Sequence, residues 1–348
     1  MRRLIGLALI GFGVFCVAFA IALPNFVYPR VAKVPENPQE KIVAKGTGLT
    51  VLVPALVVKG GNGLLTDQTV ISTRYVQGQV PPNGSKVPDG QAFYRQAYNA
   101  FVDNPSIDPA DTLLEANIEA ASFDGFTGEA TNCCGDYVIE DPTDDVGESV
   151  KHRGLVFKFP FKTERKNYEW WDSTIKATAT ARYDGTEKIN GLVTYRFIQV
   201  ITDEVVGTEA VPGAMVGSDE QSVNADRIYA TKRTLWVEPN TGAVVKGAED
   251  VNQRLSYEGK SAPIIYGHLE FTPETVQNEV DEYKPLAWRL AFVTTWGPVG
   301  GWVAGPILAL IGITILYFGR TESRDWDEWD DDDEDEDDEA DDRSFARS

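Results

Sequence analysis

Two apolar stretches decide the architecture of this chain: residues 4–23, LIGLALIGFGVFCVAFAIAL, and residues 299–318, VGGWVAGPILALIGITILYF. Neither stretch contains a charged residue. Each is about 20 residues long, which at ~1.5 Å rise per residue matches the ~30 Å hydrocarbon core of a bilayer. We therefore expect one transmembrane helix near each end of the chain.

The first stretch is also similar to a cleaved signal peptide. Arg2 and Arg3 form a basic start, and Ala20-Ile21-Ala22 is a small-residue cleavage pattern. The apolar run is longer than the ~7–15 residues of a typical signal-peptide core, however. An uncleaved anchor is the better interpretation, and the cleaved alternative stays open.

Positive charge sets the expected orientation. Arg2 and Arg3 precede the first span, and Arg320 and Arg324 follow the second, which is typical of cytoplasmic ends. Two spans place both ends on one side of the membrane and the middle of the chain on the other. We expect the protein in the cytoplasmic (plasma) membrane, with its main domain outside the cell.

The expected organisation has five parts. They are a cytoplasmic start (1–3), a span (4–23), an extracytoplasmic domain (24–298, of which 273–298 is a helical, interfacial segment), a span (299–318) and a cytoplasmic tail (319–348). Aromatic residues beside the spans are candidate membrane-interface residues. These are Tyr28, Trp288, Trp296, Trp302 and Tyr317.

The tail carries much of the formal net charge of −21. Residues 330–339 are ten consecutive acids, which repel one another and bury no apolar area, so we expect the tail to be disordered. It is either a solvated tail or a contact for a basic cytoplasmic protein. Nucleic acid is not an expected partner, because phosphates need a positive surface.

The middle of the chain is interpreted as mainly antiparallel β structure. Apolar residues there alternate or form short β-branched runs. Asp184-Gly185 and Asn190-Gly191 are typical of tight hairpin turns. Strands are expected at 49–58, 69–79, 155–161, 174–183, 186–189, 192–200, 228–237, 243–246 and 264–271.

Helical inserts are expected at three places. Residues 91–102 and 109–114 are candidates, and Thr272-Pro273-Glu274 is an N-cap followed by proline, which predicts a helix from 273 toward 283. The fold class is therefore an α+β membrane protein, with two terminal transmembrane helices flanking a mainly antiparallel β ectodomain.

The cysteines offer one candidate redox site. Cys133 and Cys134 are adjacent, and outside the membrane thiols tend to pair. They can pair with each other, which is a switch candidate, with another chain, or with a lipid or thiol modifier. The alternative is two reduced thiols that pack a turn. Cys16 is an ordinary apolar residue of the first span. Adjacent sulfurs lack the spacing of zinc ligands, so no metal site is expected.

The residues give little sign of catalysis. His152, in Lys151-His152-Arg153, is interpreted as part of a solvated basic trio, and His268 faces solvent or an inner cavity. The chain contains no G-x-S-x-G, no P-loop and no H-E-x-x-H. We expect a non-enzymatic protein with no cofactor, and keep a carboxylate-dependent hydrolase as an alternative.

Several motifs resemble an actinobacterial membrane family of unassigned function, named the porin PorA family. The motifs are FPFKTERKNYEWWD (159–172), YDG (183–185), LVTYRF (192–197), NCCG (132–135) and WVEPNTG (236–242). The resemblance covers nearly the whole chain except the acidic tail. It implies a role in cell-envelope assembly, since some members are connected with lipomannan and lipoarabinomannan maturation. The layout is also similar in topology to the class B scavenger receptors.

A porin function fits the sequence poorly, because a pore needs a closed barrel with an apolar outer band or several spanning helices. The first hypothesis is a module that binds or conducts an envelope lipid or lipoglycan, and it predicts an enclosed apolar cavity. The second is a scaffold that positions a glycosyltransferase or flippase. The candidate ligand-binding residues are an aromatic cluster, of which Trp170 or Trp171 is expected to be free. The cluster is Phe157, Phe159, Phe161, Tyr168, Trp170 and Trp171.

Overall fold

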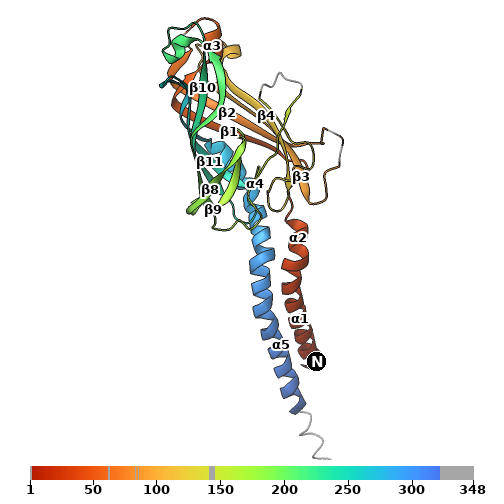
Figure 1. Cartoon of the computed structure of the whole chain (residues 1–348). Helices are drawn as coiled ribbons and strands as arrows, with labels where there is room; N and C mark the ends of the chain where they lie inside the picture. The colour runs from red at the N-terminus through yellow and green to blue at the C-terminus, as the bar shows by residue number, and fades with distance from the viewer. Residues whose placement is uncertain (1, 62, 83, 85, 141–145, 322–348) are drawn as a thin grey trace, which may run out of the picture. The chain divides into compact units, whose positions relative to one another are not determined.

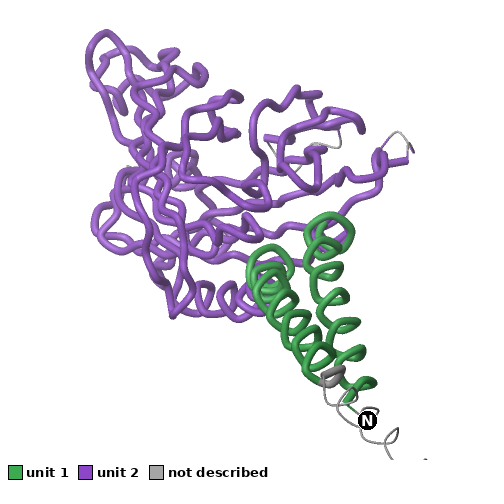
Figure 2. Tube along the Cα trace, turned by 90° about the horizontal axis from the view of Figure 1, so that it is seen from below, with its two compact units in different colours: residues 1–28, 292–348 green, residues 29–291 purple. Residues whose placement is uncertain are grey.

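The computed structural model describes residues 2–61, 63–82, 84, 86–140 and 146–321 (Figure 1). It divides into two compact units (Figure 2). Unit 1 holds residues up to Tyr28 and from Phe292 onward, and unit 2 is Pro29–Ala291. The expected acidic tail lies outside the described residues.

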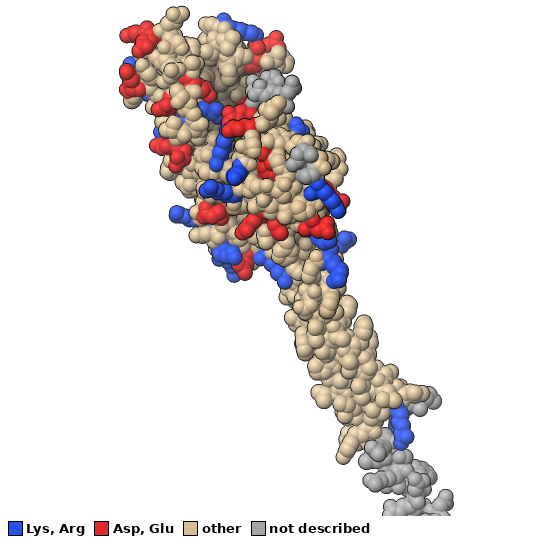
Figure 3. Space-filling view, turned by 45° about the vertical axis from the view of Figure 1, so that its right-hand side comes forward, with Lys and Arg blue, Asp and Glu red and all other residues tan. Residues whose placement is uncertain are grey.

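Unit 1 is a pair of helices. They are α1 (Arg2–Ala22), continued by the π-helix η1 (Leu23–Val27), and α5 (Gly297–Thr321), preceded by the π-helix η4 (Phe292–Trp296). Two helical runs, Arg2–Val31 and Pro273–Phe318, are long and apolar enough to cross a membrane. Figure 3 shows that the face of these helices in view is almost bare of charge, whereas charged residues are spread over unit 2. The chain is thus a membrane protein with a spanning helix toward each end.

Glycines let α1 and α5 pack closely in antiparallel directions. A Cβ added to Gly13 would lie 2.6 Å from the carbonyl oxygen of Gly305, and one added to Gly6 would lie 3.0 Å from that of Gly312. Gly6, Gly13 and Ala20 are seven residues apart, so they line one face of α1. Small residues at such spacing allow backbone approach in a bilayer, where no hydrophobic effect drives helices together.

Unit 2 is built on one sheet of twelve antiparallel strands, in the order β6-β5-β4-β3-β2-β1-β12-β11-β10-β9-β8-β7. The first six strands are β1 (Gln39–Leu52), β2 (Leu64–Gly78), β3 (Gln91–Val102), β4 (Leu113–Asp124), β5 (Tyr137–Ile139) and β6 (Glu148–Ser149). The others are β7 (Tyr168–Asp172), β8 (Ala177–Ile189), β9 (Leu192–Val211), β10 (Val223–Val237), β11 (Val244–Tyr257) and β12 (Lys260–Phe271).

The short helices are α2 (Tyr28–Val31), which begins at the last residue of the first segment of unit 1, and α3 (Pro54–Val58). The 3₁₀ turns are η2 (Pro109–Asp111) and η3 (Gly213–Val216). The longer α4 (Pro273–Ala291) begins after Thr272, whose hydroxyl accepts a hydrogen bond from the backbone N–H of Thr275. The predicted helix from residue 273 is confirmed and runs beyond 283. Val276, Val280 and Ala287 bury one face of it in a cluster with Val245 of β11.

The sheet curls so that its β7 end approaches β4. Leu155 pairs with Trp170 of β7 on one side and with Glu129, just after β4, on the other. The indole nitrogen of Trp171 also donates to Glu119 of β4, at 2.7 Å. One face of the sheet is therefore an inner face, and its main apolar cluster joins β1–β3 to β9–β12.

The inner face shows the period of two that β-strands impose. Along β10 the inward positions are Val223, Ala225, Arg227, Tyr229, Thr231, Arg233, Leu235 and Val237. Two arginines thus point inward within a mostly apolar row.

Several predicted elements are wrong. Residues 91–102 form β3 rather than a helix, because β2 and β4 pair with them on both sides. The expected strand 49–58 ends at Leu52, since Pro54 begins α3. Asp184-Gly185 is not a turn, because β8 continues through a register shift there. Asn190-Gly191, with φ values of 46° and 83°, is the predicted hairpin turn.

Candidate functional site

The predicted aromatic cluster is part of the core. Phe159 stacks between Trp170 and Phe197, with ring centroids 4.8 and 4.6 Å away. Phe161 is also buried, Tyr168 is half-buried against the same group, and half-buried Phe157 packs with Trp171 in a neighbouring cluster. Trp170 and Trp171 are both buried, so the expectation that one of them is free is wrong. A ligand-binding role for the cluster stays a prediction.

His152 lies at the centre of a buried polar array that the sequence analysis missed. Only 2% of the residue is exposed, so its assignment to a solvated trio is wrong. Its Nε2 lies 3.0 Å from Oε1 of Glu119, and its Nδ1 lies 3.0 Å from Oδ2 of Asp136. The Asn132 side chain accepts a hydrogen bond from the backbone N–H of His152 and donates one to its carbonyl.

Two carboxylates hold a positive charge on His152. Burial alone would lower the pKa of its imidazole, but the hydrogen bonds to Asp136 and Glu119 and the charges of these two acids together outweigh burial and raise that pKa to about 9. Glu119 accepts further hydrogen bonds from the indole of Trp171 at 2.7 Å and the amide of Gln96 at 2.8 Å. The Glu119 carboxylate of β4 therefore links β4 to Gln96 of β3 and to Trp171 of β7.

Cys133 and Cys134 form a disulfide beside this array. The backbone N–H of Cys133 donates to the hydroxyl of Ser122, and that hydroxyl donates to Asp136 at 2.7 Å. Cys134 is buried against Phe93 and Ala120. The disulfide is thus linked by hydrogen bonds to the acid that holds His152.

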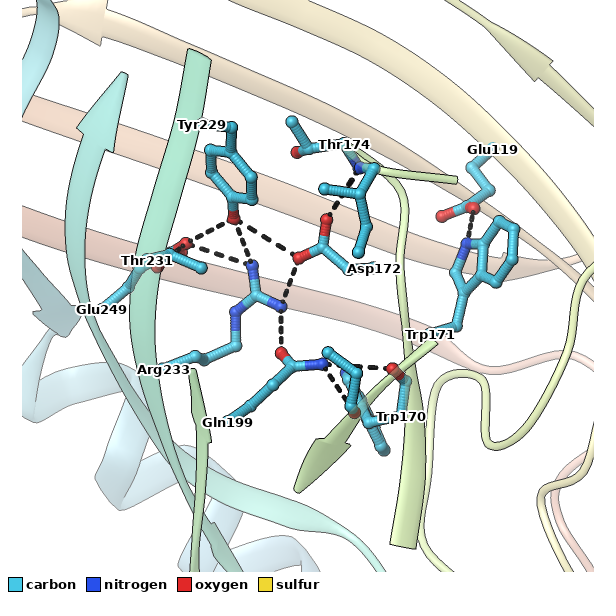
Figure 4. A network of polar contacts seen from close by, with 12 residues as sticks. Glu119, Trp170, Trp171, Asp172, Thr174, Gln199, Tyr229, Thr231, Arg233 and Glu249 are labelled. Carbon is cyan, nitrogen blue, oxygen red and sulfur yellow. Dashed lines mark hydrogen bonds and ion pairs between the residues drawn. The ribbon is translucent and has the colours of Figure 1, made fainter. Parts of the chain in front are cut away.

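A second polar network centres on Arg233 of β10 (Figure 4). Its guanidinium donates to Asp172 at 2.9 Å, to Gln199 at 2.9 Å and to Glu249 at 3.1 Å. The Tyr229 hydroxyl lies among the same groups, 3.2 Å from Glu249. Burial opposes the charge on Glu249, but Arg233 and the hydrogen bonds from Thr231 and Tyr229 together outweigh burial and lower the pKa of that carboxyl.

More charged residues of the inner face keep contact with solvent. The side chains of Glu115, Arg227 and Glu249 are 35%, 30% and 30% exposed. Glu115 of β4 faces Arg227 of β10 at 4.0 Å, across the interior of the curled sheet. Burial raises the pKa of the Glu115 carboxyl, and Arg227 opposes that rise.

The side chains of these networks are engaged mainly with one another. Ser122 is fully buried, and its hydroxyl already accepts from Cys133 and donates to Asp136. The two carboxylates lie at opposite nitrogens of the His152 ring and do not converge. Among the residues that the structure describes, no group of three or more His, Cys, Asp and Glu side chains is arranged to hold a metal ion.

A groove in unit 1 is apolar. It lies between α1 and α5 and is lined by Gly13, Val17, Gly305 and Pro306, among others.

Four of the five predicted interface residues are exposed, namely Trp288, Trp296, Trp302 and Tyr317, whereas Tyr28 is buried. Their placement at a membrane surface, and an enclosed cavity in unit 2, stay predictions.

The missed residues had one signal in the sequence. Arg227 and Arg233 lie on the same, inward face of β10, and the other inward residues of that strand are mostly apolar. Such a charge needs an inward partner, because burying it alone is costly. The partners come from strands far away in sequence, so pairing could not be assigned without the fold.

Fold and site together define a membrane protein with two spanning helices and a curled, twelve-stranded antiparallel domain whose inner face carries polar networks. The model of the family described as Porin PorA matches residues 5–314, so the chain belongs to that family. A protein named Porin PorA from Corynebacterium resistens (strain DSM 45100 / JCM 12819 / GTC 2026 / SICGH 158) is 22% identical, over 93% of this chain and 99% of the relative. Another of that name from Corynebacterium amycolatum is 21% identical, over 93% of this chain and 100% of the relative.

Proposed function

We propose that unit 2 binds an envelope amphiphile, a lipid or lipoglycan, along the inner face of its sheet, and passes it on during envelope assembly. In this proposal the helices hold the protein in the cytoplasmic membrane, with unit 2 outside the cell. The protein acts without catalysis and without a cofactor.

One observation carries the proposal: the inner face combines apolar clusters with charged side chains that stay partly exposed. Leu49, Val51 and Val70 are fully buried in the main cluster, whereas Glu115 and Arg227 keep about a third of their side-chain surface. An ion pair gives little stability, and burying charge is costly, so stability alone does not favour this arrangement. An amphiphile has both an apolar part and a polar part for such a surface.

Native mass spectrometry of the full chain, purified in detergent from its own membrane, tests the proposal. We expect a co-purifying lipid or lipoglycan, and less of it in a Glu115→Gln, Arg227→Gln double variant. Arg196→Gln is the matched control, because Arg196 pairs with Asp184 and Glu187 on the other face of the sheet. No bound amphiphile in the unaltered protein would contradict the proposal.

Orientation needs its own test. Arg2, Arg3, Arg320 and Arg324 motivate the proposed topology. Alkaline phosphatase inserted after Gly217, an exposed residue beyond η3, is expected to be active, because that enzyme matures only outside the cytoplasm. Activity of a cytoplasmic reporter at the same position would overturn the extracytoplasmic placement.

The name of the relatives favours a second candidate, a pore. Single-channel currents in planar bilayers, dependent on added protein, would support it.

The scaffold alternative, in which the tail binds a basic cytoplasmic protein, concerns residues beyond Thr321. Deleting residues 325–348 separates it from ligand binding, since a scaffold would lose its partner and a lipid binder would keep its ligand.

A further inference from the structure

Arg74, in the middle of β2, is a charged residue of the inner face that belongs to neither the His152 array nor the Arg233 network. Val70, Ser72 and Val76 lie on the same face of β2 and are buried, whereas Arg74 is exposed. Its guanidinium makes neither a hydrogen bond nor an ion pair with any residue in the described part of the chain. A side chain with five N–H donors thus faces the interior of the curl with none of them used.

The surroundings of Arg74 disfavour its positive charge. Although Arg74 is accessible to solvent, the strands around it partly desolvate its guanidinium and lower the pKa of that group, and Arg233 is the neighbouring charge that lowers it further. Tyr98, which pairs directly with Arg74 across β2 and β3, acts in the opposite direction, as do Glu249 and Glu119. The sum leaves a cation in a position where an added negative group would be stabilised.

The nearby carboxylates are already engaged elsewhere. Glu249 accepts from Arg233 at 3.1 Å and from Thr231 at 2.8 Å. Glu119 accepts from Trp171, and His152 lies 3.0 Å from it. Arg74 is therefore the charge on this part of the inner face that these acids leave unmatched.

We propose that Arg74 binds an oxyanion, a phosphate or carboxylate group, presented by the molecule that occupies the inner face of the sheet. This rests on the proposed function and narrows its ligand to an anionic amphiphile. A planar guanidinium takes both oxygens of such a group in two parallel hydrogen bonds. The ring of Tyr98 beside it packs against the main apolar cluster and offers the adjoining apolar surface.

Calorimetric titration of the detergent-solubilised full chain tests the site with three probes: octyl phosphate, octyl glucoside and inorganic phosphate. We expect Arg74→Gln to weaken octyl phosphate binding roughly tenfold or more, because a charge-assisted hydrogen bond is lost. Arg74→Lys keeps the positive charge but lacks the two parallel donors of a guanidinium. We expect its affinity for octyl phosphate to lie between that of the unaltered chain and that of Arg74→Gln. Arg182→Gln is the matched control, since Arg182 is an exposed arginine on the other face of β8.

The outcomes separate the site from the proposed function. Equal octyl phosphate affinity in the unaltered chain, Arg74→Gln and Arg74→Lys overturns the Arg74 site, even where an amphiphile co-purifies with the protein. Inorganic phosphate binding as tightly as octyl phosphate supports the oxyanion site but overturns its assignment to an amphiphile. Binding of neither octyl probe, with no co-purifying amphiphile, overturns both.

Discussion

His152 and Glu119 form a buried ion pair, with Nε2 of the ring 3.0 Å from Oε1 of the carboxylate. Because the pKa of His152 is raised from 6.5 to about 9, the folded protein holds its proton more tightly than the unfolded chain. The stability this contributes is fully present below pH 6.5 and is lost as pH rises through about 9. The loss is on the order of 3 kcal/mol for a shift of this size.

Denaturant unfolding of the full chain across that pH window measures the effect. In His152→Gln the fall of stability with rising pH should flatten, because glutamine does not titrate. His268→Gln, which alters a half-exposed histidine beside Asp250, should keep the fall. An equally steep fall in His152→Gln would show that other groups cause it.

The hydrogen bond from Trp171 to Glu119 yields a second prediction. Trp171→Phe keeps an aromatic ring but removes the donor, so Glu119 loses one of its partners inside the protein. We expect the free energy of unfolding to fall by about 1–3 kcal/mol beyond the cost of the smaller ring.

Trp170→Phe supplies that comparison. Trp170 is equally buried, and its ring stacks on Phe159 at 4.8 Å without an indole hydrogen bond to a described residue. The difference between the two variants isolates the indole donor. Equal losses in both would mean that the bond to Glu119 contributes nothing.

The Cys133–Cys134 disulfide predicts a distinct labelling pattern. Alkylation of the denatured, unreduced protein should modify Cys16 alone, since Cys16 is free and the other two are bonded to each other. Reduction before alkylation should add two labels. Mass spectrometry of the peptide that contains Asn132 and Gly135 reads the result, and labels on it before reduction would refute the bond.

The disulfide illustrates what local sequence can predict. Cys133 and Cys134 are adjacent, so the possibility of a bond between them follows from the local sequence alone. Likewise, the two spans and the Asn190-Gly191 turn depend only on nearby residues, and the structure has both. Helix α4 was recognisable from its N-cap and proline for the same reason.

The polar networks depend on pairing that no local pattern contains. Glu119 lies on β4, while its partners His152 and Trp171 come from 33 and 52 residues away. Residues 91–102 show the same limit, because their aromatic spacing suits a helix face and only the flanking strands make them β3. The curl of the sheet decides which charges face one another, and it is a property of all twelve strands.

The packing of α1 on α5 gives the last prediction. Gly305→Leu should weaken the helix pair, because a Cβ at this position would lie 2.8 Å from the carbonyl oxygen of Gly13 and 2.6 Å from Val17. Gly300→Leu adds the same side chain where nothing lies within 4 Å, so it is the matched control. Overpacking of this kind costs about 1–3 kcal/mol. Unfolding of the full chain by increasing fractions of sodium dodecyl sulfate, followed by tryptophan fluorescence, should show an earlier midpoint for Gly305→Leu only. Equal midpoints for both variants would mean that close glycine contact does not hold the two spans together.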